Sequence, residues 1–331
     1  MLSLKKIAVI AFQLGGPETL AAVEPFLYNL FCDPDIINFP GSFLARKPLA
    51  KYISTTRSKV VGKNYAEIGG GSPIRRLTEQ QAAALQAALA PHVNARVFVA
   101  MRYWHPDTSE ALAALPAAGP FDELVLLPLY PHYSFATTGS SLKEWNRLYK
   151  PAANSSAKNA KIPVRTIDHF YDHPDYVAAI VERINSVLTK LPDPGAVHLV
   201  FSAHGLPMVL VEKGDPYPNH IAATVALVRE MGAWPNPHVL CFQSKVGPQK
   251  WLQPSLTSTI EKLAHEGVKR MLVIPIAFLT EHIETLHEIN IEARHQAASL
   301  GVTDFHLMPA LNDSPLLINA LADLVLRSIA T

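Results

Sequence analysis

The sequence predicts an α/β protein built from two similar doubly wound halves, each with a four-stranded parallel sheet flanked by helices. Three observations support this fold class. Eight short apolar runs recur along the chain, as in strands that are buried on both faces. Amphipathic segments with helical periodicity separate these runs. The length of 331 residues favours two domains over one.

The expected strands and helices alternate in chain order. The expected strands are Lys6–Phe12, Arg96–Tyr103, Glu123–Pro131, Val164–Phe170, Val197–Ala203, His238–Phe242, Arg270–Phe278 and Phe305–Ala310. The expected helices are Glu18–Leu30, Ile74–Leu89, Tyr176–Leu188, Asn219–Met231, Pro254–Glu266 and Glu284–Ser299. Alternation of this kind implies right-handed crossovers between parallel strands.

The link between the two halves is expected at residues 151–161, which are rich in Ala, Ser, Asn and Lys. The first lobe would then comprise residues 1–150 together with a C-terminal helix at 314–331, and the second lobe residues 151–313. Ligands of open α/β sheets bind outside the C-terminal ends of the strands. The residues that follow each strand are therefore the candidate functional residues.

Composition narrows the class of protein. A formal net charge of +1 argues against non-specific nucleic-acid binding, which needs a basic surface. The two cysteines, Cys32 and Cys241, cannot build a disulfide framework, so we expect a cytoplasmic protein. No apolar stretch reaches the ~20 residues that span a membrane. Any membrane contact would be peripheral, and residues 35–51, which combine apolar and basic side chains, are expected to form an exposed lip rather than a core helix.

A histidine lies at the end of an expected strand in the stretch Phe201–Pro207. Gly205 and Pro207 prevent a helix from starting there, so His204 is placed at the strand's C-terminal end. Neutral imidazole accepts a proton or binds a metal near pH 7. The alternative is a structural histidine that hydrogen-bonds a carbonyl group. A serine nucleophile at Ser202 is disfavoured because the G-x-S-x-G turn is missing.

An acidic row follows another expected strand. Glu284, Glu288 and Glu292 recur every four residues, directly after His282. Like charges at this spacing destabilise an exposed helix by a few tenths of a kcal/mol per pair, so the row indicates a cation that passes or binds. A π-type turn would keep the row straighter than an α-helix and is typical of functional sites. A solvated helix face is the alternative, and the H-E-x-x-H zinc motif is absent.

Two further patterns follow expected strands or precede a helix. Gly69–Ser72, followed by Pro73, resembles a helix N-terminus that holds an anion such as a carboxylate, with a plain turn and capped helix as the alternative. Aromatic residues mixed with cationic or hydroxyl donors occur in Met101–Pro106, Leu129–Ser134 and Gln243–Pro248. Such a mixture suits a flat apolar ligand with acidic arms, although each aromatic residue alone would also suit the core.

Together these stretches resemble ferrochelatases, the enzymes that complete haem synthesis. The stretches that match, in family order, are Leu14–Leu20, Pro25–Asp35, Gly69–Ile74, Met101–Pro106, Thr137–Ser141, Phe201–Pro207, Gly214–Pro218, Gln243–Pro248 with Trp251, and Glu281–Leu286. The resemblance implies two Rossmann-like lobes of the class II chelatase fold. It also implies insertion of Fe²⁺ into protoporphyrin IX with release of two protons.

The resemblance also implies roles for individual residues. His204 matches the family's proton-accepting or metal-binding histidine, Glu284 its carboxylate partner, and His282 a second histidine. Glu288 and Glu292 match an acidic relay, so the implied metal-binding residues are His204, Glu284, Glu288 and Glu292. The residues that match porphyrin-side positions are Leu14, Arg57, Tyr65, Ser72, Arg102, Tyr103, Tyr130, Ser244 and Trp251.

One departure from the family pattern concerns the [2Fe–2S] cluster that many members bind through four cysteines. This chain has two cysteines and carries Phe135 at the first cluster position, so no cofactor is expected and Fe²⁺ is a substrate. The C-terminal extension that supports dimers in those relatives is missing, which favours a monomer. Two alternatives remain open: a chelatase for coproporphyrin III or sirohydrochlorin, and a non-catalytic haem or metal carrier.

Overall fold

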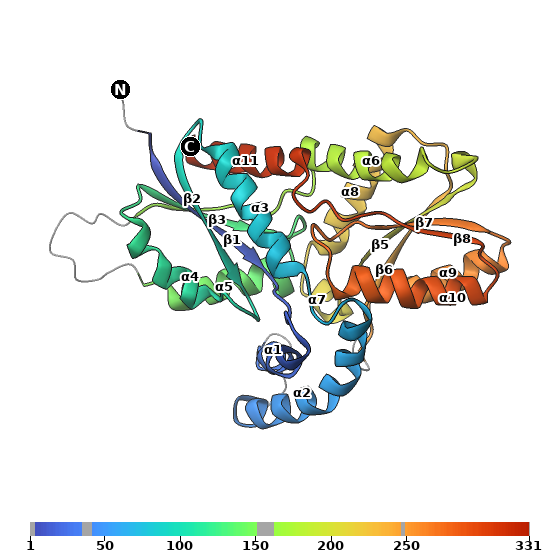
Figure 1. The fold of residues 1–331 in the computed structure, drawn as a ribbon, viewed down its shortest axis with the longest axis horizontal. Coiled ribbons are helices and arrows are strands. Elements are labelled where there is room, and N and C mark those ends of the chain that lie inside the picture. Colours follow the sequence, from blue (N-terminus) through green and yellow to red (C-terminus); the bar gives the residue numbers. More distant parts are fainter. Residues whose placement is uncertain (1–3, 35–41, 151–161, 246–248, 331) are drawn as a thin grey trace. The chain divides into compact units, whose positions relative to one another are not determined.

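A computed structural model of the chain describes residues 4–34, 42–150, 162–245 and 249–330, and it contains the two expected four-stranded parallel sheets (Figure 1). The strands are β1 (Lys6–Gln13), β2 (Asn94–Met101), β3 (Glu123–Pro128), β4 (Val164–Thr166), β5 (His198–His204), β6 (His238–Gln243), β7 (Arg270–Pro275) and β8 (Asp304–Leu307). The first sheet has the order β2-β1-β3-β4 and the second the order β6-β5-β7-β8. Both sheets therefore share one doubly wound topology, although the halves show no residue-level repeat.

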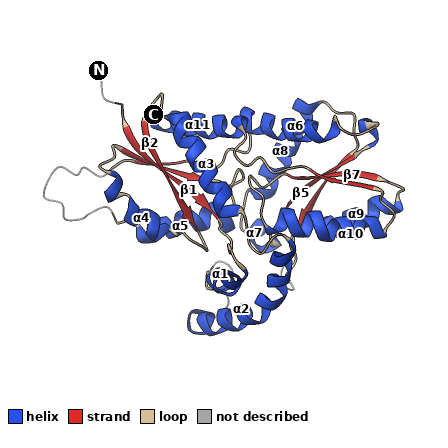
Figure 2. Ribbon diagram, viewed as in Figure 1, coloured by secondary structure: helices blue, strands red, loops and turns tan. Residues whose placement is uncertain are grey.

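Helices cover both faces of each sheet (Figure 2). The α-helices are α1 (Val23–Phe31), α2 (Ser42–Glu67), α3 (Ile74–Leu89), α4 (Thr108–Ala114), α5 (Ser140–Leu148), α6 (Pro174–Leu188), α7 (Met208–Glu212), α8 (Tyr217–Gly232), α9 (Leu256–His265), α10 (Arg294–Ser299) and α11 (Pro315–Ala330). Two π-helical segments, η3 (Phe135–Gly139) and η5 (Glu284–Ala293), precede α5 and α10. The remaining short turns are 3₁₀-helices: η1 (Leu20–Ala22), η2 (Pro116–Ala118) and η4 (Pro194–Ala196).

The chain divides into two compact units, each with one sheet. Unit 1 comprises Met1–Tyr130, Phe135–His169 and Ile318–Thr331, and unit 2 comprises Pro131–Ser134 and Phe170–Leu317. The expected division at residue 150 differs from this one because β4 pairs with β3 and so belongs to unit 1. The expected link at 151–161 lies outside the described residues.

In unit 2 the central strand β5 carries the candidate site at its C-terminal end. Val200 and Phe201, which point to opposite faces of the sheet, are both fully buried. The cluster around Val200 includes Ile260 of α9 and Ile289 of η5, while α6 and α8 cover the other face (Figure 1). Burial of each such side chain stabilises the fold by about 1.5–3 kcal/mol, which favours a single register.

The glycine-rich segment 69–71 serves close packing in unit 1. A Cβ atom on Gly71 would lie 2.1 Å from the carbonyl oxygen of Glu18, so only glycine fits there. The Ser72 amide donates to the carbonyl oxygen of Pro17 over 2.7 Å and is therefore not available for an anion. Helix α3 begins at Ile74, whose amide lies 3.4 Å from Ser72 Oγ. Of the two interpretations of this segment, the structure supports the turn before a helix.

Helix α2 is a 26-residue helix that the apolar pattern does not predict. Ala50 and Ser54 on this helix are fully buried, whereas Tyr52 and Val60 are 69% and 63% exposed. The expected lip at 35–51 coincides with the start of α2, but its first part, residues 35–41, lies outside the described residues. No helix within the described ranges is both long and apolar enough to cross a membrane.

His132 is a buried histidine in unit 2 that is held in its neutral form. Its Nε2 atom lies 2.9 Å from Thr224 Oγ1, and its Nδ1 atom is buried with no hydrogen-bond partner among the described residues. The rings of Tyr176 and Tyr217 approach it edge-on. Burial, reinforced by the charge of His220, lowers the pKa of His132 to about 3, because a second proton on the ring would be desolvated.

We predict that Gly71→Ala lowers the free energy of unfolding by about 1–3 kcal/mol, since the new methyl group would overlap the Glu18 carbonyl oxygen. Gly62→Ala is the matched control because nothing lies within 4 Å of its Cβ position inside α2. That change should raise stability by about 0.5–1 kcal/mol through helix propensity. Urea denaturation of both variants tests this, and equal effects would contradict the packing explanation.

Stability should also fall with acid through His132. Its folded pKa lies below the unfolded value of ~6.5, so the unfolded state binds the extra proton first and stability is lost as pH falls from ~6.5 towards about 3. The stability advantage of the wild type over His132→Gln should shrink by about 1 kcal/mol between pH 6 and pH 5. Denaturation curves at both pH values measure the difference, and a pH-independent difference would refute the neutral assignment.

Candidate active site at the end of strand β5

His204 is the last residue of β5, and the backbone around it fixes the imidazole. The Gly205 amide donates to the carbonyl oxygen of Gln243 over 2.7 Å, and a Cβ atom on Gly205 would lie 2.8 Å from that oxygen. Nδ1 of His204 lies 2.6 Å from the carbonyl oxygen of Gly205. A carbonyl can only accept, so the proton of the neutral ring is on Nδ1 and the lone pair is on Nε2.

His282 repeats this arrangement in the turn before η5. Its Nδ1 atom lies 3.0 Å from the carbonyl oxygen of Thr280, and its side chain is almost completely buried. The His282 amide donates to Thr285 Oγ1, which anchors the turn on the first residues of the π-helix. The neutral ring of His282 therefore also carries its lone pair on Nε2.

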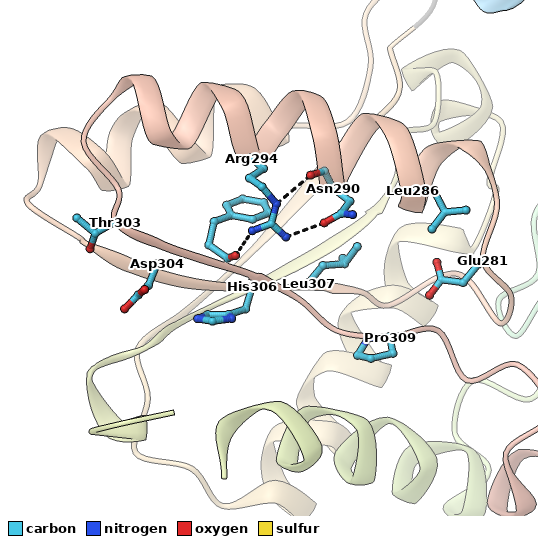
Figure 3. Close-up of a pocket in the computed structure, with 10 residues that line it drawn as sticks. Glu281, Leu286, Asn290, Arg294, Thr303, Asp304, His306, Leu307 and Pro309 are labelled. Atoms are coloured by element: carbon cyan, nitrogen blue, oxygen red, sulfur yellow. Dashed lines mark hydrogen bonds between the residues drawn. The ribbon is translucent and has the colours of Figure 1, made fainter. Parts of the chain in front are cut away.

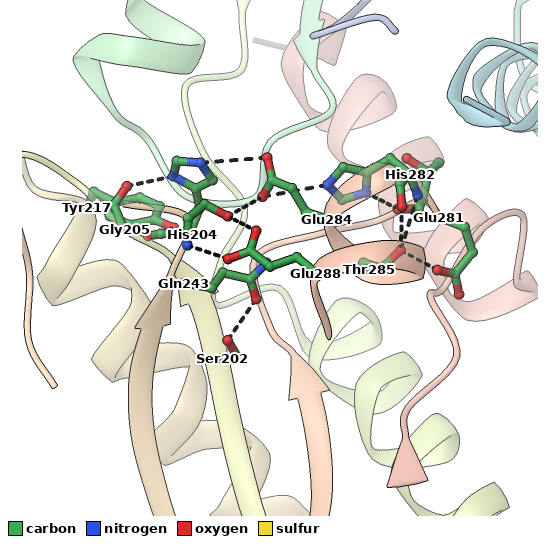
Figure 4. A network of polar contacts seen from close by, with 12 residues as sticks. Ser202, His204, Gly205, Tyr217, Gln243, Glu281, His282, Glu284, Thr285 and Glu288 are labelled. Atoms are coloured by element: carbon green, nitrogen blue, oxygen red, sulfur yellow. Dashed lines mark hydrogen bonds and ion pairs between the residues drawn. The ribbon is translucent and has the colours of Figure 1, made fainter. Parts of the chain in front are cut away.

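Glu284 lies between the two imidazoles (Figure 4). Its Oε1 atom is 3.6 Å from Nε2 of His204, and its Oε2 atom is 3.9 Å from Nε2 of His282. Burial alone would raise the pKa of Glu284, but His204, His282 and the Ser244 hydroxyl lower it to about 2. Burial by itself lowers the pKa of His282. The hydrogen bond to Glu284 and the negative charge of Glu284 outweigh burial, so the pKa of His282 is raised overall. When both rings are neutral, their Nε2 lone pairs face the negative carboxylate and repel it. A proton or a cation placed between them removes this repulsion, so the cluster is suited to hold either.

The acidic row lies in a π-helix, where the sequence predicts an ordinary helix over Glu284–Ser299. Segment η5 covers Glu284–Ala293. The Ser244 amide donates to Oε1 of Glu288 over 2.7 Å, and its hydroxyl donates to Oε2 of the same carboxylate. That hydroxyl also lies 3.3 Å from Oε2 of Glu284. Burial and the charge of Glu284 raise the pKa of Glu288, because two carboxylates share one hydroxyl group.

The exposure of the acidic side chains increases along the row. The side chain of Glu284 is 19% exposed and that of Glu292 is 58% exposed. Oε1 of Glu292 lies 3.6 Å from Nδ1 of the buried His287. The row thus offers carboxylate oxygens at increasing depth, which is the donor type that hydrated divalent cations accept.

A family model described as Ferrochelatase matches residues 6–329. The chain belongs to the ferrochelatase family. Ferrochelatases from Synechococcus sp. strain RCC307 and Geotalea uraniireducens are 45% and 46% identical to it, over 99% of this chain and 84% and 99% of their own lengths. A ferrochelatase catalyses insertion of iron into porphyrin in haem biosynthesis, a metal-chelatase reaction of the lyase class, and the alternative functions are not favoured.

Solved chelatase structures show the same fold. SirB from Bacillus subtilis with Fe³⁺ superposes with a TM-score of 0.57 at 13% identity, over 99% of this chain and 96% of that chain. CbiX, described as the terminal enzyme of sirohaem biosynthesis in denitrifying bacteria, gives 0.53 at 14% identity, over 98% and 99%. At this identity the likeness concerns the two-lobe chelatase fold alone.

The residues that match the family's porphyrin-side positions are divided between the two units. Unit 1 holds Leu14, Arg57, Tyr65, Ser72, Arg102, Tyr103 and Tyr130, and unit 2 holds Ser244 and Trp251. Trp251 packs beside Gly205, the neighbour of His204, because its ring lies 3.1 Å from the position a Cβ atom of Gly205 would take. Tyr65 is only 2% exposed and contributes to the interior of unit 1.

Asp33 is a buried residue that the sequence analysis does not single out. Its Oδ2 atom accepts from Arg102 over 2.6 Å, from Tyr103 over 2.7 Å and from Ser140 over 3.2 Å. Arg102 Nε also donates to Ser140 Oγ over 2.9 Å. The charge of Arg102 is therefore largely neutralised within unit 1. Only the position of Asp33 after an apolar helix, in a stretch that matches the family, could have indicated it.

An open cavity of about 590 Å³ lies between η5–α10 and β8, outside this site (Figure 3). It contains none of the sequence-predicted site residues. Arg294 in its wall donates to the backbone and side chain of Asn290 and to the carbonyl oxygen of Phe305. Because these bonds are internal, the arginine stabilises the wall rather than offering a charge to a ligand.

The geometry predicts the tautomer of His204. When its ring is neutral, His204 should carry the ring proton on Nδ1, because Nδ1 donates to the Gly205 carbonyl group. The ¹⁵N chemical shifts of the imidazole, measured on ¹⁵N-histidine-labelled protein, distinguish the two tautomers. Exposed His92 serves as the internal reference for a solvated ring. A protonated Nε2 on His204 would contradict the assignment.

Proposed function

We propose that this ferrochelatase inserts Fe²⁺ into protoporphyrin IX, with Nε2 of His204 accepting the pyrrole protons and Glu284 binding the iron beside it. The observation that carries the proposal is the carboxylate of Glu284 between the Nε2 atoms of His204 and His282.

The reaction sets the chemical requirements. Two N–H protons leave the porphyrin, Fe²⁺ loses water ligands, and two Fe–N bonds to pyrrolide nitrogens form together with two dative bonds, without a change of oxidation state. A base with a lone pair directed outward serves the proton transfers, which contribute typically 10²–10⁴-fold to rate. His204 meets this requirement because its Nδ1 proton is already used by Gly205.

The metal must be bound and then released. Two imidazoles and carboxylates suit Fe²⁺, and neutral nitrogen donors with few carboxylates bind it less tightly than a thiolate site would. His204, Glu284, Glu288 and Glu292 are the proposed metal-binding residues, with His282 holding Glu284 in place. Exposed Glu292 would meet hydrated iron first, and the shared Ser244 hydroxyl would bring Glu288 next to Glu284.

The choice of tetrapyrrole rests on the number of carboxylates. Protoporphyrin IX carries two propionates, whereas coproporphyrin III and sirohydrochlorin carry more. Among the proposed porphyrin-side residues only Arg57 and Arg102 are cationic, and Arg102 is paired with Asp33. This small supply of cations favours the substrate with the fewest acidic groups. The remaining proposed contacts are Leu14, Tyr65, Ser72, Tyr103, Tyr130 and Trp251.

The state of the protein in the cell is also a proposal. We propose a cytoplasmic monomer without an iron–sulfur cluster, with peripheral membrane contact through residues 35–51. The count of two cysteines supports the absence of a cluster, since a cluster needs four ligands. The exposed apolar side chains of Tyr52 and Val60 in α2, the helix that includes part of this segment, support the membrane contact.

His204→Ala should lower the rate of iron insertion by about 10²–10⁴-fold, because the base is lost. Protoporphyrin should still bind, as a change of its fluorescence can show. The measurement is anaerobic mixing with Fe²⁺, followed by the Soret band. His265→Ala is the matched control, because that histidine is exposed on α9 and bonds only the helix backbone. Near-normal turnover with porphyrin bound would refute the assigned role.

A further inference from the structure

Ser244 directly follows β6 and has an unusual backbone. Its φ angle is +64°, in the left-handed region that residues other than glycine seldom adopt. In this conformation its amide and its hydroxyl reach the two oxygens of one carboxylate, that of Glu288. A strained backbone that points two donors at one acid is typical of a functional position.

The hydroxyl group of Ser244 is already committed to acids. A hydroxyl has one proton to donate, and Oγ of Ser244 donates it to Glu288 while lying 3.3 Å from Glu284. No donor is therefore left for a porphyrin propionate. The family resemblance places Ser244 on the porphyrin side, but its contacts in the structure are with the acidic row.

The contact joins two separate elements of unit 2. Glu288 belongs to the π-helix η5, and Ser244 follows β6, whose last residue, Gln243, is paired with His204 in register. Any shift of Glu288 relative to Glu284 would have to break the two bonds from Ser244. The spacing of the two carboxylates beside His204 is thus set from the sheet rather than by the helix alone.

We propose that Ser244 is a positioning residue for the metal: it holds the Glu288 carboxylate beside Glu284 and so controls the use of Fe²⁺ rather than the binding of porphyrin. This inference rests on the proposed function of the same site. Groups that orient a metal ligand typically contribute about 10- to 100-fold to metal affinity.

The test uses Ser244→Ala and Ser244→Gly, with Ser299→Ala on α10 as the control because that hydroxyl bonds only the carbonyl oxygen of Gln296. Both Ser244 variants lack Oγ. Glycine adopts the positive φ angle without strain, so the glycine variant keeps the test valid if the alanine variant folds poorly. Co²⁺ is titrated into the porphyrin-free protein and followed by its visible absorption. KM is then measured separately for Fe²⁺ and for protoporphyrin IX.

Both Ser244 variants should bind Co²⁺ about 10-fold more weakly and show a similar rise in KM for Fe²⁺, with KM for protoporphyrin and the control unchanged. A rise in KM for protoporphyrin alone would overturn the inference. So would a glycine variant that behaves like the wild type, since the backbone rather than the hydroxyl would then matter. If the wild type itself inserted no iron, the proposed function would fail, and the Co²⁺ titration would still judge Ser244.

Discussion

The geometry at the end of β5 depends on one constraint: the carboxylate of Glu284 is kept between the Nε2 atoms of two imidazole rings. The protein achieves this by tying both Nδ1 atoms to backbone carbonyl groups, at Gly205 and at Thr280. Each ring then has one remaining nitrogen, and both of these nitrogens face Glu284. The cluster is electrostatically incomplete, and a proton or a divalent cation completes it. This is the condition that a site for exchanging protons against iron requires.

The π-helix and the sheet share the task of holding the acidic residues. Residues four apart lie on one side of a helix, and the π-helical segment η5 places Glu284 and Glu288 on the side that faces Ser244. The carboxylates of Glu284 and Glu288 are both partly buried, and their negative charges repel each other. Ser244 weakens this repulsion by donating two hydrogen bonds to Glu288, and a bound metal ion would remove the rest of it. The π-helix and the left-handed Ser244 backbone therefore both occur at the candidate site.

The two units contain buried acids of opposite character. Asp33 in unit 1 receives hydrogen bonds from arginine, tyrosine and serine, so its charge is balanced by its own chain. Glu284 and Glu288 in unit 2 have imidazoles and a hydroxyl, but no lysine or arginine ion pair among the described residues. A balanced acid stabilises structure, and an unbalanced acid attracts a ligand. This difference separates Asp33 from the acids that we propose to bind the metal.

The sequence alone determined what depends on local pattern. Continuous apolar runs define parallel strands, and their positions place His204 at the end of β5 and Glu284 in the helix that follows β7. The four-residue spacing of the glutamates indicated one acidic row on a helix, while the π-helical form of that segment came from the structure. Tertiary structure decided what depends on contacts between distant segments: the closeness of Gly71 to Glu18, the pairing of Asp33 with Arg102, and the attachment of Ser244 to Glu288. These contacts join residues that no short-range periodicity relates, because their geometry is set by how strands and helices pack.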